Sequence, residues 1–196
     1  CKKNNVKKII VASSAAVYGE GNEKYKITEQ TKLNAISPYG ESKIEMEKEI
    51  IKFCSNNQIN YVILRFFNIY GLNQSMEYAG VITKFLEKIE KSENLIIFGD
   101  GMQTRDFVAI EDIINSIHNA MEYTENGIFN IASGEKITIK ELAELMILLS
   151  NKTLGIEYVK SKKGDIKYSE ADIQLAKNYL NYFSKIELKD GIKKLM

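Results

Sequence analysis

Apolar and polar residues follow one another along the chain with two different periods, and their order predicts the class of fold. Short runs rich in β-branched residues occupy positions 7–12 and 61–67, as expected for buried strands. Between them, Ser37 and Pro38 are typical of a helix N-cap and first turn, and the helical pattern continues to about residue 55. A strand, a helix and a second strand in this order predict a right-handed parallel crossover unit of an α/β protein.

Further along the chain the predicted elements are more numerous and less regularly ordered. Before them, between the first strand and the helix that starts at Pro38, residues 15–36 have no periodic pattern and are expected to form a long loop. Thr138 and Glu141 have the spacing of a capping box at the start of a helix. Helices are predicted over residues 80–91, 112–123, 138–149, 172–180 and 188–195. Strands are predicted over residues 95–98, 107–108, 128–132 and 156–159.

Composition narrows the class of protein without identifying a function. The 196 residues are 44% hydrophobic, enough for one domain with a sizeable core, with or without a small appendage. A formal net charge of +1 gives no reason to expect nucleic acid or an acidic membrane as a partner. No apolar run approaches the roughly 20 residues that span a bilayer. Two cysteines and one histidine predict neither a disulfide framework nor a metal site, so a cytoplasmic protein is expected.

The predicted sheet is incomplete. Two parallel strands do not make a stable doubly wound sheet, and no Gly-x-Gly-x-x-Gly sequence follows a strand near the start. We therefore expect a further part of the sheet to precede Cys1, which is not the usual first residue of a polypeptide.

Candidate chemistry gathers at the ends of the first two strands. Ser13 and Ser14 end the first strand and Asn68 follows the second, and open parallel sheets bind ligands beyond the carboxyl ends of their strands. Tyr39 and Lys43 lie one helical turn apart at the start of the crossover helix. An ammonium near a phenol favours the phenolate, which can accept a proton. Ser14, Tyr39 and Lys43 therefore have the residue types needed for proton transfer.

Spacing alone does not make this pair an active site. In a lysine-rich chain with 11 tyrosines the same spacing arises by chance, and Tyr158 and Lys162 repeat it. A buried tyrosine beside a surface lysine is the simpler explanation of such a spacing. The surrounding sequence has to decide between the two interpretations.

Six segments resemble the extended short-chain dehydrogenase/reductase family, and within it the nucleotide-sugar epimerase group typified by UDP-glucose 4-epimerase. The segments are SSAAVYG (13–19), SPYGESK (37–43), LRFFNIYG (64–71), GDGMQTRDFV (99–108), FNIASGEKITIKEL (129–142) and GDIKYSEADI (164–173). They follow the order and spacing of that family over essentially the whole chain. Tyr39 and Lys43 lie inside the pattern, and the second tyrosine–lysine pair lies outside it.

The resemblance implies the C-terminal part of a doubly wound parallel, Rossmann-like sheet plus a small α/β substrate-binding domain. Residues 1–75 would be the remaining half of the dinucleotide-binding sheet, with the catalytic serine, tyrosine and lysine. Residues 76–196 would be mainly the nucleotide-sugar-binding domain, and strand 128–132 is a candidate to return to the main sheet. The implied cofactor is NAD. A homodimer is expected of the full-length protein, and this piece is expected to be inactive alone.

The implied activity is epimerisation at C4 of a UDP-hexose through transient oxidation to a 4-keto sugar. UDP-glucose and UDP-galactose are the expected substrates, with N-acetylated forms as further candidates. By resemblance, Ser14 would bond the reacting sugar hydroxyl, Tyr39 would be the acid/base, and Lys43 would hold the nicotinamide ribose and favour the ionised tyrosine. Ser13 and Phe66 are expected to contact the cofactor together with Tyr39 and Lys43.

The resemblance also implies a set of substrate contacts. Asn68 would contact the diphosphate or the sugar, and Phe98 would line the uracil pocket. Arg105 would bind the diphosphate, for which a planar guanidinium is well suited. Asp165 would bind the uridine ribose.

Four further positions help to choose among family members. Lys162 stands where many relatives have a second phosphate-binding arginine, so it keeps the charge and loses the bidentate geometry. Ser169 is small where a bulky residue restricts the sugar pocket in some epimerases, which leaves room for an N-acetyl group. Ala15 and Ala16 replace the Asp-Glu pair of nucleotide-sugar dehydratases, so dehydration is not expected.

Two other interpretations stay open. The first is a nucleotide-sugar ketoreductase or decarboxylase of the same family, which net consumption of reduced nicotinamide would distinguish from an epimerase. The second is a non-catalytic nucleotide-binding relative, in which loss of the tyrosine hydroxyl would have no effect.

Overall fold

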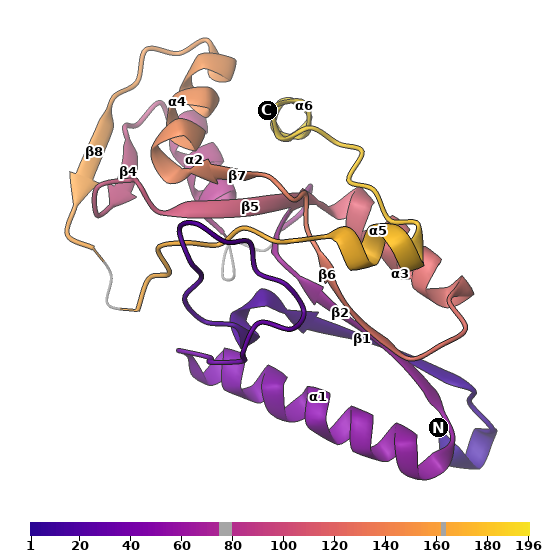
Figure 1. Ribbon diagram of the computed structural model, residues 1–196. Helices are drawn as coiled ribbons and strands as arrows, with labels where there is room; N and C mark the ends of the chain where they lie inside the picture. The colour runs from indigo at the N-terminus through magenta and orange to yellow at the C-terminus, as the bar shows by residue number, and fades with distance from the viewer. Residues whose placement is uncertain (75–79, 162–163) are drawn as a thin grey trace.

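A parallel sheet forms the centre of the molecule (Figure 1). The computed structural model describes residues 1–74, 80–161 and 164–196. The sheet consists of β1 (Lys8–Ser14), β2 (Asn60–Phe66) and β6 (Gly127–Ile131), in the order β1-β2-β6. Ser14 lies opposite Phe66, and Phe66 lies opposite Ile131, so the three strands end at one rim. The described part has the expected α/β fold with a Rossmann-like parallel sheet.

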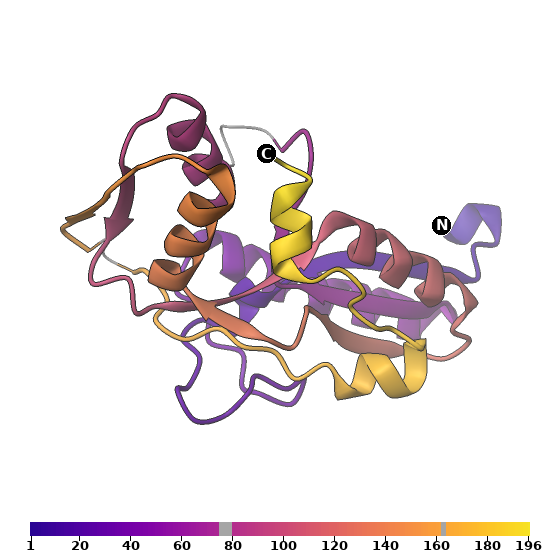
Figure 2. The ribbon, with the colours of Figure 1, turned by 90° about the horizontal axis from the view of Figure 1, so that it is seen from above.

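Helices cover both faces of this sheet. Helix α1 (Pro38–Asn57) lies on one face, and α3 (Ile110–Glu122) and α5 (Gln174–Leu180) lie on the other (Figures 1 and 2). Strands buried on both faces have near-continuous apolar sequences, which explains why these strands showed no alternation of apolar and polar residues.

Helix α1 begins and ends at residues with the expected capping properties. The Ser37 Oγ accepts a hydrogen bond of 3.1 Å from the Gly40 N–H, and Pro38 occupies the first helical position. Gln58 adopts a left-handed conformation and ends the helix. The helix therefore starts as predicted and runs two residues past the expected end at residue 55.

The inner face of α1 is only partly apolar. Cys54 on this face is buried, whereas Ile44, Ile50 and Ile51 are half-buried, with Ile44 packed against the core. Glu47 is 2% exposed and lies at the middle of this face. Apolar periodicity gives no sign of a buried carboxylate, because such a group depends on partners elsewhere in the chain.

The outer face of α1 is charged. Glu45 pairs with Lys48, and Glu49 with Lys52, each one turn apart and open to solvent. Within the described ranges, no helix combines the length and the apolar character needed to cross a bilayer.

A smaller unit continues from the rim of the main sheet (Figure 2). One of its sheets consists of β3 (Asn68–Tyr70), β5 (Thr104–Ala109) and β7 (Lys136–Thr138), and the other of β4 (Leu95–Phe98) and β8 (Ile156–Val159). Three helices pack with them around a second apolar core, α2 (Val81–Glu90), α4 (Ile139–Ser150) and α6 (Leu188–Lys193). Thr138 and Glu141 form the predicted capping box.

The structure departs from the sequence prediction mainly at short elements. Strand β3 has no counterpart among the predicted elements, β5 is longer than the predicted 107–108, and the 3-10 helix η2 (Ala15–Val17) lies in the expected loop. Strands β3 and β7 have three residues each, too few to show a period, and both pair with β5. Strand β6, which overlaps the predicted strand 128–132, pairs with β2 and so belongs to the main sheet, as the sequence suggested it could. The expected domain boundary at residues 75 and 76 lies outside the described residues.

Candidate active site

Ser14 lies where β1 ends and the chain turns. It is the last residue of β1 and the N-cap of η2, and its Oγ accepts a 3.2 Å hydrogen bond from the Ala16 N–H. A serine hydroxyl that captures a nearby backbone N–H stops a strand, because it offers the chain an alternative to the sheet ladder. The hydroxyl is therefore held at the rim of the main sheet and is only partly buried.

Tyr39 and Lys43 occupy the first turns of α1, on the side of the same rim. The tyrosine is 56% exposed, and the Lys43 Nζ lies 5.6 Å from the centre of its ring. The Lys43 Nζ also donates a 3.0 Å hydrogen bond to the Ala12 carbonyl oxygen in β1. The lysine thus connects the tyrosine-bearing helix to the strand that ends at Ser14.

A glycine allows the helix to approach the turn after Ser14. A Cβ at Gly40 would lie 2.4 Å from the Ala16 carbonyl oxygen and 2.9 Å from the Ala35 Cβ. Real Cβ atoms do not come so close to a backbone oxygen, so only glycine fits without a shift. Together with the bond from Lys43 to Ala12, this contact brings Ser14, Tyr39 and Lys43 to one rim.

A buried polar cluster lies directly behind this rim. Glu47, on α1, accepts hydrogen bonds from Arg65 Nε at 3.0 Å and Arg65 Nη2 at 2.6 Å, and one from the Ser13 Oγ. Ser13 and Arg65 are register partners on β1 and β2, so the carboxylate contacts both strands. Sequence reasoning missed this cluster. Its only local sign is a glutamate four positions after Lys43, on the same helix face.

The cluster continues across the sheet to β6. The Arg65 Nη1 donates to the Tyr18 hydroxyl at 2.8 Å, and that hydroxyl donates to the Asn130 Oδ1 at 2.6 Å. Burial raises the pKa of Tyr18 to about 12, against the opposing effect of Arg65. Burial alone would lower the pKa of Arg65, but the hydrogen bonds and charges of Glu47 and Tyr18 raise it overall. Arg65 is therefore held firmly in its charged form.

A cavity of about 360 Å³ lies in the smaller unit, between α2 and the ends of β3, β4 and β5. Much of its wall is apolar, formed by residues such as Val81, Phe85 and Ile97. The wall also contains four of the seven residues expected to bind the substrate, Asn68, Phe98, Arg105 and Asp165. An apolar cavity with a few polar groups is typical of a small-molecule site.

Arg105 and Asp165 pair with each other at the edge of this cavity. The Arg105 Nη2 lies 2.6 Å from the Asp165 Oδ1, and the Nη1 donates to the carbonyl oxygens of Ile166 and Thr104. Burial lowers the pKa of Arg105 from its ordinary value, and the carboxylate partly offsets this. The sequence predicted two separate nucleotide contacts here, and the structure adds that they form an ion pair.

Comparisons with known proteins show the family to which the chain belongs. The family model described as "NAD dependent epimerase/dehydratase family" matches residues 1–132. The chain belongs to this family. A curated relative, the putative UDP-glucose 4-epimerase of Methanocaldococcus jannaschii, is 36% identical over the whole of this chain and 64% of its own length. Relatives named UDP-glucuronic acid decarboxylase also match the chain.

Solved structures of the family have the same fold. The UDP-N-acetylglucosamine 4-epimerase of Methanobrevibacter ruminantium, in complex with UDP-N-acetylmuramic acid, matches 99% of this chain and 63% of its own with 34% identity and a TM-score of 0.93. The UDP-glucuronic acid 4-epimerase of Bacillus cereus, in complex with UDP-glucuronic acid and NAD, matches 100% and 64% with 32% identity and a TM-score of 0.90. The chain thus spans less than two thirds of the length of these family members.

The other residues that the family resemblance assigned to the site lie outside the cavity or outside the described residues. Ser13 is buried and its hydroxyl is bonded to Glu47, so this side chain presents no hydroxyl at the rim. Phe66 ends β2 opposite Ser14 and packs partly against the core. Ser169 is buried, its N–H bonds the Thr104 Oγ1, and it is not among the residues that line the cavity. Lys162 lies outside the described residues.

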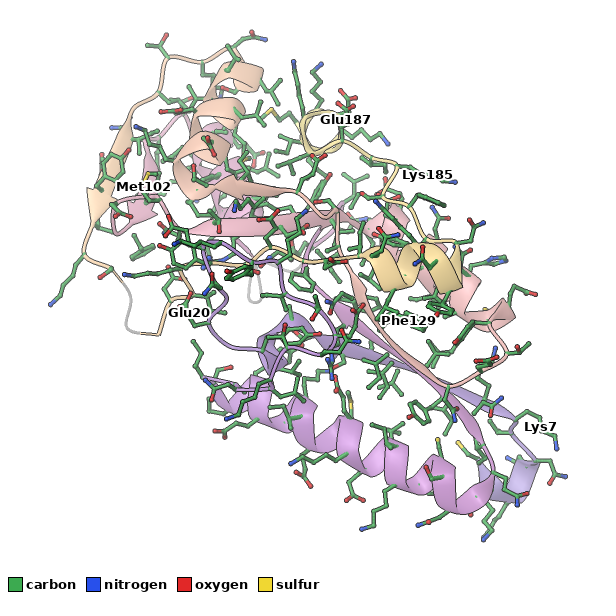
Figure 3. All side chains as sticks on the ribbon, in the orientation of Figure 1. Lys7, Glu20, Met102, Phe129, Lys185 and Glu187 are labelled. Carbon is green, nitrogen blue, oxygen red and sulfur yellow. The ribbon has the colours of Figure 1, made fainter. Side chains whose placement is uncertain are left out.

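Two carboxylates of the long loop join it to distant segments of the chain. Glu20 accepts hydrogen bonds from the N–H groups of Lys167 and Tyr168, which ties the long loop to the segment after Asp165 (Figure 3). Glu29 accepts a bond from the Asn130 N–H, and burial raises its pKa. Neither contact has a sequence signal, because each joins segments more than 100 residues apart.

Sequence reasoning also missed Asp106, which lies on β5 between the cavity-lining residues Arg105 and Phe107. Its fully buried carboxylate accepts bonds from the Ser133 N–H and Oγ–H and from the N–H groups of Gly134 and Ala171. Its backbone carbonyl accepts a 2.8 Å bond from the Asn68 side chain. Burial raises the pKa of Asp106 to about 6, against these four donors.

Proposed function

We propose that this chain carries the catalytic rim and the nucleotide cavity of an NAD-dependent 4-epimerase that acts on a UDP-hexose. The observation that carries the proposal is the grouping of Ser14, Tyr39 and Lys43. Two segments supply them, the end of β1 and the start of α1, and the bond from Lys43 to Ala12 and the close approach at Gly40 join these segments. A hydroxyl, a phenol and an ammonium at the carboxyl ends of parallel strands suit proton transfer from a bound alcohol.

The rim has groups that fit a dinucleotide. Lys43 uses one of its three N–H donors on the Ala12 carbonyl, so it can also bond the hydroxyls of a ribose. Phe66 offers a partly exposed apolar surface at the end of β2. The chemistry that NAD would supply when bound here is hydride transfer from the sugar and back to its opposite face. Relatives in this family include one solved with NAD, which supports this assignment.

Each catalytic residue has a definite task in this proposal. In its phenolate form Tyr39 accepts the proton of the sugar C4 hydroxyl, and the resulting phenol later returns that proton. The ammonium of Lys43 lies 5.6 Å from the centre of the phenol ring and places a positive charge beside this residue. The Ser14 hydroxyl accepts a bond from the Ala16 N–H and can donate its own proton to the sugar oxygen.

The cavity is proposed to hold the nucleotide. Arg105 would bind the diphosphate and Phe98 would contact the uracil, and both side chains line the cavity. Asn68 also lines it and lies two residues after Phe66, the register partner of Ser14. A UDP-sugar whose diphosphate lies near Asn68 would therefore direct its sugar toward the catalytic rim.

The identity of the sugar is the finer part of the proposal. UDP-glucose and UDP-galactose are the first candidates. The argument for N-acetylated sugars depends on the small side chain of Ser169, and this residue does not line the described cavity. Solved relatives bind UDP-N-acetylmuramic acid and UDP-glucuronic acid, so a panel of UDP-sugars is the appropriate assay.

The deciding experiment uses Tyr39→Phe in the full-length protein that contains residues 1–196. Loss of the hydroxyl should lower kcat by about 10²- to 10⁴-fold, the usual value of general acid–base catalysis, while UDP-sugar binding persists. Tyr25→Phe is the matched control, because Tyr25 is 73% exposed in the long loop. Unchanged turnover in Tyr39→Phe would refute the proposal. Net consumption of reduced nicotinamide by the wild type would indicate a reductase instead.

A further inference from the structure

A buried ion pair fastens the helix that bears Tyr39 and Lys43 to the main sheet. Glu47 and Arg65 are 2% and 3% exposed, and two hydrogen bonds of 3.0 Å and 2.6 Å join them in a bidentate contact. The hydroxyl of Ser13 donates to the same carboxylate. One side chain of α1 is thus bonded to both β1 and β2.

Stability alone does not explain such a pair. A buried ion pair can usually be replaced by well-packed apolar residues with no loss of stability, because desolvation offsets much of the attraction. What the pair adds over an apolar contact is direction, since a guanidinium and a carboxylate meet in one planar arrangement. A helix held in this way has its rotation and its position along the axis defined.

The position of Glu47 relates this constraint to the chemistry. Tyr39, Lys43 and Glu47 follow one another at intervals of four, so they lie along one side of α1. The partners of Glu47 immediately precede the strand ends, Ser13 before Ser14 and Arg65 before Phe66. The carboxylate therefore sets where the tyrosine stands relative to the serine.

Arginine is required on the other side of the pair. Its Nε and Nη2 both bond Glu47, and its Nη1 bonds the Tyr18 hydroxyl at 2.8 Å and the Glu29 carbonyl oxygen at 3.2 Å. A lysine ammonium has no fixed fork of donors and could not make these contacts together. Arg65 thus joins α1 to the turn after Ser14 and to the long loop.

We propose that Glu47 and Arg65 are positioning residues for catalysis, and that their pairing aligns Tyr39 and Lys43 with Ser14. The inference rests on the proposed epimerase function and concerns the same site. Neither residue is expected to touch the substrate, because both are buried beneath the helix.

The test compares three variants of the full-length protein, Glu47→Gln, Arg65→Lys and the apolar pair Glu47→Leu/Arg65→Met. Misalignment of a catalytic group by about 1 Å costs on the order of 100-fold in rate, so kcat should fall about 10- to 100-fold in each variant. KM for the UDP-sugar should stay within about twofold, because the residues that line the nucleotide cavity belong to the smaller unit. The apolar pair should regain the melting temperature lost by the single variants and still have low kcat.

Asp112→Ala is the matched control. Asp112 is also a fully buried carboxylate, and its Oδ2 accepts bonds from the Ser184 Oγ–H and from the N–H groups of Lys185 and Ile186. It fastens α3, which covers the opposite face of the main sheet from α1, to the C-terminal segment. This variant should lose melting temperature and keep kcat, which separates loss of stability from loss of alignment.

A crystal structure of the apolar pair gives a readout that is independent of turnover. We expect the 3.0 Å bond from the Lys43 Nζ to the Ala12 carbonyl to lengthen or break. If that bond persists, or if kcat recovers together with stability, the positioning role is wrong. If the wild type has no epimerase activity but the bond still breaks, the proposed function fails and the positioning role stands.

Discussion

The two arginines of the chain, Arg65 and Arg105, serve the two halves of the site in opposite ways. Arg65 lies beneath the catalytic rim, and its partner Glu47 is as deeply buried as itself. Arg105 lies at the edge of the nucleotide cavity with a side chain 15% exposed, and its partner Asp165 is 34% exposed. The first pair is sealed from solvent and from ligands. In the second pair, Arg105 is accessible enough for a ligand phosphate to replace the Asp165 carboxylate.

Their surroundings affect the pKa values in opposite directions. Glu47 and Tyr18 raise the pKa of Arg65 above its ordinary value in spite of burial, whereas burial lowers the pKa of Arg105. A cation that is partly desolvated and incompletely compensated gains from an added phosphate, and one with a full set of partners does not. This difference supports the two proposals, that Arg65 aligns the rim from beneath and that Arg105 binds a ligand phosphate.

Replacing each arginine by methionine should give the largest contrast, in stability. Arg65→Met leaves Glu47 buried without its partner, which should cost about 3–5 kcal/mol of unfolding free energy. Arg105→Met should cost about 1 kcal/mol, because the remaining carboxylate can be solvated. Urea unfolding of the two full-length variants measures both values. Equal losses would contradict the contrast drawn between the two sites.

Substrate affinity should show the reverse contrast. Arg105→Met should raise KM for the UDP-sugar by the equivalent of about 1.5–3 kcal/mol, the usual contribution of a hydrogen bond to a charged group. Steady-state kinetics should show that Arg105→Lys recovers only part of this loss, because lysine keeps the charge without the fork. A normal KM in Arg105→Met would remove the diphosphate from this position.

A smaller effect is expected from a substitution at Gly40, where α1 lies close to the Ala16 carbonyl oxygen. Gly40→Ala should lower kcat and cost about 1–3 kcal/mol of stability, as for overpacking elsewhere, because the new Cβ would lie 2.4 Å from the Ala16 carbonyl oxygen. The effect should exceed the gain of about 1 kcal/mol from better helix propensity. Gly155→Ala is the control, since its Cβ would first meet the Asn94 side chain. Unaltered kinetics and stability in Gly40→Ala would show that the helix can retreat without consequence.

The smallest expected effect is the pH dependence of stability that Asp106 causes. The pKa of Asp106 is raised to about 6 in the folded protein from an ordinary value of 3.8, so this group stabilises the fold at low pH and loses that contribution as the pH rises through 6. The slope is at most about 1.4 kcal/mol per pH unit. Chemical unfolding between pH 4 and 8 should show this component in the wild type and not in Asp106→Asn. An identical difference between the two proteins at every pH would contradict the assignment.

Much of the architecture could be predicted because its signals are local. The capping serine before Pro38, the capping box at Thr138 and the apolar runs of β1 and β2 each occupy a few neighbouring residues. Short elements escaped prediction for the same reason, since three-residue strands such as β3 and β7 exist only through pairing with β5.

The candidate site shows the same division. Ser14, Tyr39 and Lys43 were found from a motif, and the structure places them at one rim. Glu47 was missed because a glutamate on a helix normally faces solvent, and only a buried arginine 18 residues away reverses that expectation. Asp106 was missed because its four donors come from segments 27 to 65 residues further along the chain.

By itself the sequence determined the order and type of the main elements, the residue types at the catalytic rim and the family to which the chain is similar. Apolar periodicity, caps and motifs are properties of neighbouring residues, so they survive without coordinates. Only the tertiary structure decided that Glu47 meets Arg65 and Ser13, and that Arg105 meets Asp165. Such contacts depend on strand register and on the rotation of a helix over a sheet, and no local pattern encodes either of them.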